Sequence, residues 1–138
     1  FSEFIVDKGN YYISSIDGVL FDITGTTLLA FPRCKSGSYK IPDGVTKIKE
    51  SAFRHCNGLT SLEIPSSVTS IGEWSFKDCS TLKVLIISVS NTALTGEDSN
   101  FNESSLETIY LGRDINISFS GQCNLEELTI GSKVTALN

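Results

Sequence analysis

The sequence predicts a β-dominated solenoid, an elongated fold in which similar coils stack on one another. Two neighbouring blocks carry this prediction: residues 41–63 and 64–86 align without a gap and share ten of 23 residues. The shared residues are, in order, Ile, Pro, Val, Thr, Ile, Glu, Phe, Cys, Leu and Leu. A unit of this size cannot bury its own apolar face, so several units must stack to build a continuous core.

Further copies continue the pattern with decreasing fidelity. Residues 87–110 form a looser copy, residues 111–129 a shortened one, and residues 130–138 the first part of a fifth. Each apolar slot of the unit therefore predicts a column of side chains through the stack. The predicted columns are Phe53, Phe76, Phe101 and Phe119; Leu62, Leu85, Ile109 and Leu128; and Ile41, Ile64, Ile87, Leu111 and Ile130.

Within one unit, the local pattern predicts two strands and a tight turn. Residues 59–64 end in the alternation typical of a half-buried strand, and Pro65 ends it because proline cannot donate to a ladder. Residues 68–71 predict a second, shorter strand. Residues 73–79 are too few for a full helix, so we expect a single helical or 3₁₀ turn that places Phe76 inside.

Residues 1–40 do not follow the repeat. The apolar segments 19–21 and 28–31 flank Thr24 and Gly25, a pattern typical of a β-hairpin. Packed on the first coil, this hairpin would cover an open apolar end, as the ends of solenoids require. We therefore expect one structural domain, made of an N-terminal capping region, residues 1–40, and a repeat solenoid, residues 41–138.

Composition narrows the class of protein. The chain has 138 residues, 40% hydrophobic and 20% charged, which is a composition that folds. Its net charge of -5, without a cluster of Lys or Arg, argues against a nucleic-acid partner. The longest apolar stretch, residues 84–87, is far shorter than the ~18 residues of a membrane span. Because the chain begins at Phe1 and contains no Met, we expect a processed or excised piece.

The four cysteines predict no cofactor, metal site or catalytic residue. Cys34, Cys56, Cys79 and Cys123 include no Cys-x-x-Cys pair, and a zinc cage would lack ligands because the chain has one His. Cys56 and Cys79 share one slot on adjacent coils, a spacing that permits a disulfide. Buried thiols are favoured over that bridge, because the repeat carries Cys as a packing residue.

A cysteine nucleophile would need an adjacent base, and His55 is the only candidate. His55 and Cys56 are neighbours on a turn, so their side chains should diverge. His55 also matches Asp78 in the next copy, which indicates a position that faces solvent.

Two columns should point outward from the longer strands. Val84, Ile86 and Tyr110 would meet in the middle of that face, with Glu63 and Thr108 beside them. An exposed apolar cluster with a tyrosine is typical of a binding surface. Ordinary β-propensity, or cover by a neighbouring chain, explains the same residues equally well. The two columns are Ser38, Ser61, Val84, Thr108 and Glu127; and Lys40, Glu63, Ile86, Tyr110 and Thr129.

The repeat resembles the BspA-like class of leucine-rich repeats. The unit Ile-Pro-x-x-Val-Thr-x-Ile-x-x-x-(Ala/Ser)-Phe-x-x-Cys-x-x-Leu-x-x-Leu is clean at 41–63 and 64–86, and residues 6–21 are similar to the segment that precedes it in that family. The resemblance implies a right-handed α/β leucine-rich-repeat solenoid, on the surface of or secreted by bacteria or mucosal protists. It also implies adhesion to host matrix proteins. The family has no shared catalytic motif, so no functional residue is carried over.

Two function classes follow. The first is a non-enzymatic adhesion module that binds a host or matrix protein, or a glycan, through the sheet face. The second is a structural spacer with no ligand of its own, whose outward columns should be uniformly polar. An enzyme is disfavoured because no acid–base pair, nucleophile constellation or phosphate loop can be named.

Overall fold

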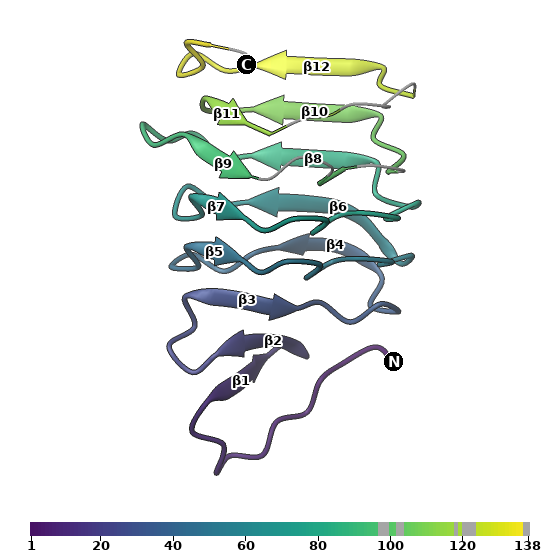
Figure 1. Cartoon of the computed structure of the whole chain (residues 1–138). Helices are drawn as coiled ribbons and strands as arrows, with labels where there is room; N and C mark the ends of the chain where they lie inside the picture. The colour runs from purple at the N-terminus through teal and green to yellow at the C-terminus, as the bar shows by residue number, and fades with distance from the viewer. Residues whose placement is uncertain (97–99, 102–103, 118, 120–123, 137–138) are drawn as a thin grey trace.

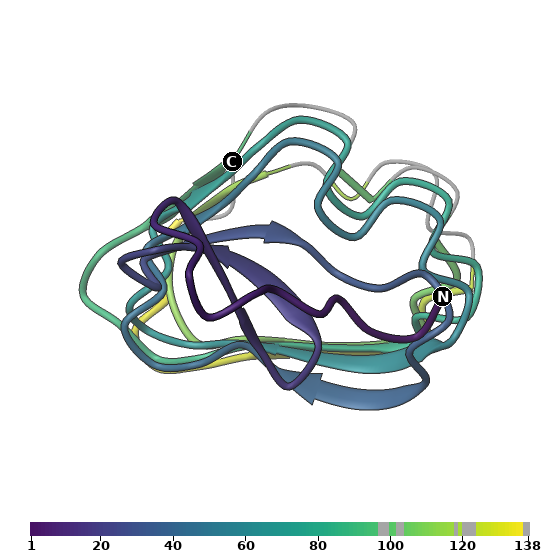
Figure 2. The same cartoon turned by 90° about the horizontal axis from the view of Figure 1, so that it is seen from below.

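The chain winds into a stack of coils whose two long sides are β-sheets, parallel throughout the repeat region. The computed structural model describes residues 1–96, 100–101, 104–117, 119 and 124–136. Each repeat adds one strand to each sheet, so the solenoid predicted from the repeats is confirmed (Figure 1). Seen along the stack, the outlines of the coils superimpose, and the N-terminal segment crosses the end of the stack (Figure 2).

The five-stranded sheet is built from the longer strands of the repeats. All its neighbouring strands are parallel. Leu62 pairs with Leu85, Leu85 with Ile109, and Ile109 with Leu128, which confirms the predicted leucine column. In order across the sheet, the strands are β12 (Glu127–Ile130), β10 (Thr108–Leu111), β8 (Val84–Ile87), β6 (Leu59–Ile64) and β4 (Gly37–Lys40).

The second sheet has seven strands and changes character along its length. From β3 onward its strands are parallel, whereas β1, β2 and β3 form an antiparallel meander. The segments 19–21 and 28–31 pair through Leu20 with Ala30 and Phe21 with Leu28. The capping role of residues 1–40 stays a prediction. The strands are β1 (Ile13–Ile16), β2 (Val19–Asp22), β3 (Thr27–Ala30), β5 (Lys47–Ile48), β7 (Ser70–Ile71), β9 (Leu94–Gly96) and β11 (Ile115–Asn116).

A ladder of phenylalanine rings runs through the core. The ring centroids of Phe53 and Phe76 are 5.1 Å apart, those of Phe76 and Phe101 4.8 Å, and those of Phe101 and Phe119 5.0 Å. This spacing repeats the distance between neighbouring strands, because each coil contributes one ring. The ladder begins one ring earlier than predicted, at Phe31, whose centroid lies 4.9 Å from that of Phe53.

The turn that places Phe76 inside contains no helix. Residues 73–78 form a turn, and Trp74 and Asp78 have left-handed backbone angles, φ 53° and 61°. Ser51 and His55 adopt the same conformation in the preceding coil, at φ 57° and 61°. A helix cannot pass through such residues, because the left-handed region breaks its hydrogen-bond ladder. The expected helical or 3₁₀ turn is therefore not found among the described residues here.

The backbone hydrogen bonds explain this conformation. The amides of Ser51, Phe53 and His55 donate to the carbonyls of Glu73, Ser75 and Lys77 in the next coil, at 3.0, 2.8 and 3.1 Å. The alternate amides of Ala52, Arg54 and Cys56 donate within their own coil to the residue three positions earlier. The turn side thus behaves as a third hydrogen-bonded face. Pairing between coils replaces the bonds that a helix would make within one coil.

Phe76→Ala should lower the free energy of unfolding by about 3–5 kcal/mol, because the substitution opens a cavity in the middle of the ring ladder. Urea denaturation followed by circular dichroism measures the change. Glu50→Ala, at an exposed position, is the matched control and should change stability by less than about 0.5 kcal/mol. A loss below about 1 kcal/mol for Phe76→Ala would show that the ladder is not a main source of stability.

Candidate functional site

The outer face of the five-stranded sheet carries both predicted outward columns in register. Val84 pairs with Ser61 on one side and Thr108 on the other. Ile86 pairs in the same way with Glu63 and Tyr110. The columns continue through Glu127 and Thr129 of β12 and through Ser38 and Lys40 of β4.

We name the group Val84, Ile86 and Tyr110 the apolar patch. All three side chains are half-buried and alternate with fully buried Leu85 and Ile109 along β8 and β10. The alternation turns them away from the core because successive side chains of a strand point to opposite faces. The structure thus brings together the residues that the sequence predicts on this face, and their binding role stays a prediction.

The tyrosine of the patch leans toward the last strand. A Cβ atom at Gly131 would lie 3.0 Å from the Tyr110 hydroxyl, so this hydroxyl reaches across to the residue that follows β12. The ring therefore lies along the sheet rather than standing away from it. Its polar end is directed toward the corner of the solenoid at residues 131–136.

Ion pairs between coils border the apolar patch. Lys40 Nζ lies 3.1 Å from Glu63 Oε1, and Lys83 Nζ lies 2.7 Å from Glu107 Oε1. In each case the hydrogen bond to the glutamate raises the pKa of the lysine. Exposed pairs of this kind contribute little stability, but they fix charges at defined places on the face. Lys40 and Glu63 are 23 residues apart in one outward column, so the repeat spacing places them side by side.

Two cysteines, Cys56 and Cys79, lie beside the phenylalanine ladder. Cys56 and Cys79 are buried free thiols, and Cys34 is an exposed one. The Cys79 thiol donates to the carbonyl of Phe53 at 3.0 Å, and the Cys56 thiol approaches that of Phe31 at 3.8 Å. Burial raises the pKa of Cys79 to about 12 and also raises that of Cys56. Thiolates are therefore disfavoured at both positions; Cys123 lies outside the described residues.

His55 lies at the surface beside the next coil. Its Nδ1 is 3.3 Å from Asp78 Oδ2, and its side chain is 42% exposed. This contact joins the two residues that occupy the same slot of the repeat. No group of three or more His, Cys, Asp and Glu that could hold a metal ion occurs within the described part of the chain.

Arg113 is a buried charged residue that sequence reasoning missed. It is fully buried and donates to the carbonyls of Pro65 at 2.9 Å, Ser66 at 3.1 Å and Thr92 at 3.4 Å. Burial lowers its pKa. One weak sequence signal indicates this burial. Arg113 lies in the corner between the two sheets, the segment between β10 and β11, which is shorter than the equivalent segment of the other copies.

The stacked coils, the two parallel sheets and the inward apolar columns define a leucine-rich-repeat solenoid. The chain belongs to the BspA type leucine-rich-repeat family, which it matches in six copies across residues 28–138. The matched region includes residues 28–40, where β3, Phe31 and β4 already contribute to the stack. No curated protein matches the chain.

Solved structures of bacterial proteins share the fold. Pneumococcal vaccine antigen PcpA superimposes with a TM-score of 0.78 at 28% identity, over 94% of this chain. A leucine-rich repeat protein from Bacteroides ovatus gives a TM-score of 0.59 at 24% identity, over 85% of this chain. A leucine rich cell surface protein from Faecalibacterium prausnitzii gives 0.55 at 24% identity, over 86%. The chain spans 33%, 31% and 39% of these three proteins.

Among the described residues, no helix is long and apolar enough to cross a membrane.

The buried cysteines should resist alkylation in the folded protein. At about pH 8, iodoacetamide should modify Cys34 readily and leave Cys56 and Cys79 unmodified, because burial hinders access and disfavours the thiolate. Peptide mass spectrometry resolves the sites, and the same reaction in denaturant should modify all three. If Cys79 reacts as fast as Cys34 without denaturant, the Cys79 thiol is not protected by burial in the folded protein, which contradicts the prediction.

Arg113→Met should destabilise the protein by about 2–4 kcal/mol, since charged hydrogen bonds to three backbone carbonyls are lost. Exchange of the backbone amide hydrogens should rise at residues 66–67 and 88–93, measured by mass spectrometry. Arg33→Met, at an exposed arginine, is the control and should leave both stability and exchange unchanged. Wild-type exchange at these segments in Arg113→Met would contradict the anchoring role.

Proposed function

We propose that this chain is a non-enzymatic surface or secreted binding module, whose contact surface is the outer face of the five-stranded sheet. The single observation that carries the proposal is the apolar patch of Val84, Ile86 and Tyr110, held in register on β8 and β10. Outward side chains of the sheet do not pack in the core of the solenoid. An apolar cluster at the centre of this face therefore favours contact with a binding partner.

The layout of the face supports a protein or glycan partner. Polar and charged residues surround the patch, with Ser61 and Glu63 on β6 and Glu127 and Thr129 on β12. An apolar centre with a polar rim is the usual anatomy of a protein interface. Tyr110 offers both a ring and a hydroxyl, which suits contact with protein side chains and with sugar rings.

An extracellular setting is part of the proposal. It draws on membership of the BspA type repeat family and on the likeness to PcpA, a pneumococcal vaccine antigen. A host or matrix protein, or a glycan, is the partner class that fits such a setting. The second candidate, a structural spacer without a ligand, is favoured by the regular polar columns on the other strands, but it leaves Val84, Ile86 and Tyr110 without a role.

The double variant Ile86→Ser/Tyr110→Ser should lose binding at least tenfold while the fold is retained, because it removes apolar contact area from the centre of the face (a tenfold loss is about 1.4 kcal/mol). Surface plasmon resonance against a panel of extracellular matrix proteins and glycans measures the effect. Circular dichroism and urea denaturation verify that the coils remain folded.

A matched control places serines on the opposite sheet. Lys47→Ser/Asn116→Ser changes two exposed positions on β5 and β11 and should bind as the wild type does. Equal binding by Ile86→Ser/Tyr110→Ser and the wild type would overturn the proposed surface. No binding of the wild type to any member of the panel would favour the spacer.

A further inference from the structure

The corners that link the two sheets are not all the same length, and this irregularity creates a cleft. In the third coil the corner between β8 and β9 covers residues 88–93, whereas in the fourth coil the corner between β10 and β11 covers only residues 112–114. The corners of the third and fifth coils therefore face one another across the short one. Two strand spacings separate these coils, about 9–10 Å, which is enough room for a six-membered ring.

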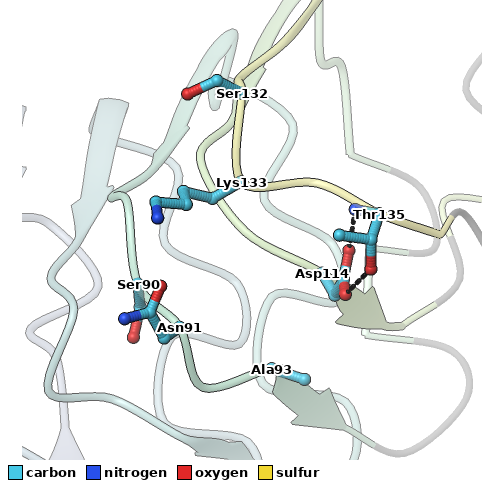
Figure 3. Close-up of a pocket in the computed structure, with 7 residues that line it drawn as sticks. All are labelled: Ser90, Asn91, Ala93, Asp114, Ser132, Lys133 and Thr135. Carbon is cyan, nitrogen blue, oxygen red and sulfur yellow. Dashed lines mark hydrogen bonds between the residues drawn. The ribbon is translucent and has the colours of Figure 1, made fainter.

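The cleft is an open cavity of about 530 Å³, lined by residues from all three corners (Figure 3). This volume lies in the range of small-molecule sites. The third coil contributes one wall, Asp114 of the fourth coil the floor, and the fifth coil the opposite wall. The lining residues are Ser90, Asn91, Ala93, Asp114, Ser132, Lys133 and Thr135.

Two features of the fourth coil hold this geometry in place. Arg113 binds the carbonyl of Thr92, within the long corner, and those of Pro65 and Ser66 in the second coil. Gly112 permits the close approach of the corners, since a Cβ atom there would lie 2.5 Å from the amide nitrogen of Val89. Arg113 and Gly112 of the fourth coil therefore hold the wall formed by residues 88–93 in place.

The fifth coil is tied to the floor of the same cleft. The backbone amide and the hydroxyl of Thr135 donate to the Asp114 carboxylate, the hydroxyl at 2.6 Å, and the amide of Ala136 donates to Oδ1 at 3.0 Å. These hydrogen bonds, that of the Thr135 hydroxyl above all, lower the pKa of Asp114 and keep it ionised. Oδ2 retains a free lone pair that can accept from a ligand.

The donors of the cleft stand opposite this acceptor. Lys133 extends toward the side on which Ser90 and Asn91 lie, and no acidic residue in the described part of the chain pairs with it (Figure 3). The Ser90 hydroxyl accepts from the amide of Thr92 at 3.1 Å, which leaves its proton available. The cleft thus combines an ionised carboxylate with ammonium, amide and hydroxyl donors.

We propose that this cleft binds the vicinal hydroxyl pair of a neutral sugar ring. Each hydroxyl of such a pair both donates and accepts, so one can donate to Asp114 while its neighbour accepts from Lys133 or Asn91. Lys133 and Asp114 cancel in charge, and the net charge of -5 on the chain disfavours an acidic ligand. This site is distinct from the apolar patch and does not depend on the function proposed for that patch.

The test follows backbone amide shifts by NMR during titration with methyl β-galactopyranoside, methyl α-mannopyranoside and methyl β-glucopyranoside. At least one sugar should shift amides at residues 90–93, 114 and 132–136 with a dissociation constant on the order of 1–10 mM. Tetrahydropyran-2-methanol has a similar ring without the vicinal pair and should shift none of them. The absence of shifts at these amides with all three sugars, up to about 50 mM, would overturn the proposal.

Substitutions then locate the binding groups. Lys133→Met keeps the aliphatic stem, removes the ammonium and should weaken binding about tenfold. Lys47→Met, at an exposed lysine of β5, should bind as the wild type does, and so should Ile86→Ser in the apolar patch. Undiminished binding by Lys133→Met, or loss of the sugar shifts in Ile86→Ser, would place the sugar elsewhere and contradict the cleft.

Discussion

Hydrogen bonding between the backbones of successive coils is the constraint on which the rest of the molecule depends. It operates in the two sheets and on the turn side, where Ser51, Phe53 and His55 bond to the next coil. Once the backbone of one coil is laid against the next, equivalent residues must fall into columns. The apolar columns close the core, and the outward columns create a face whose composition can change without disturbing the stack.

The ring ladder and the cysteines illustrate how side chains exploit this constraint. Phe53, Phe76 and Phe101 each meet one ring above and one ring below in their own column. The Cys79 thiol donates to the carbonyl of Phe53, which also accepts from the backbone amide of Cys56 in its own coil, so this thiol joins two neighbouring coils. A cysteine here is a small, weak donor whose packing matters more than its reactivity.

The repeat predicted the columns because period and register are properties of the sequence itself. Leu62, Leu85 and Ile109 needed only a count of residues, and so did the outward positions of Val84 and Tyr110. The turn at residues 73–78 was harder, because Asp is only a weak sequence signal of the left-handed angle found at Asp78, and Trp74 gives no such signal. The cleft could not be predicted, since it depends on how two corners of unequal length lie in space and on the unexpected burial of Arg113.

Arg113 also has a mechanical consequence. A simple solenoid can unravel one coil at a time, because each coil contacts only its two neighbours. Arg113, in the fourth coil, holds carbonyls of the third and of the second, so it spans a coil that lies between. Separating the fourth coil from the third therefore requires contacts with two coils to break together, instead of contacts with one. The stack therefore contains a point at which gradual unravelling gives way to a single larger step.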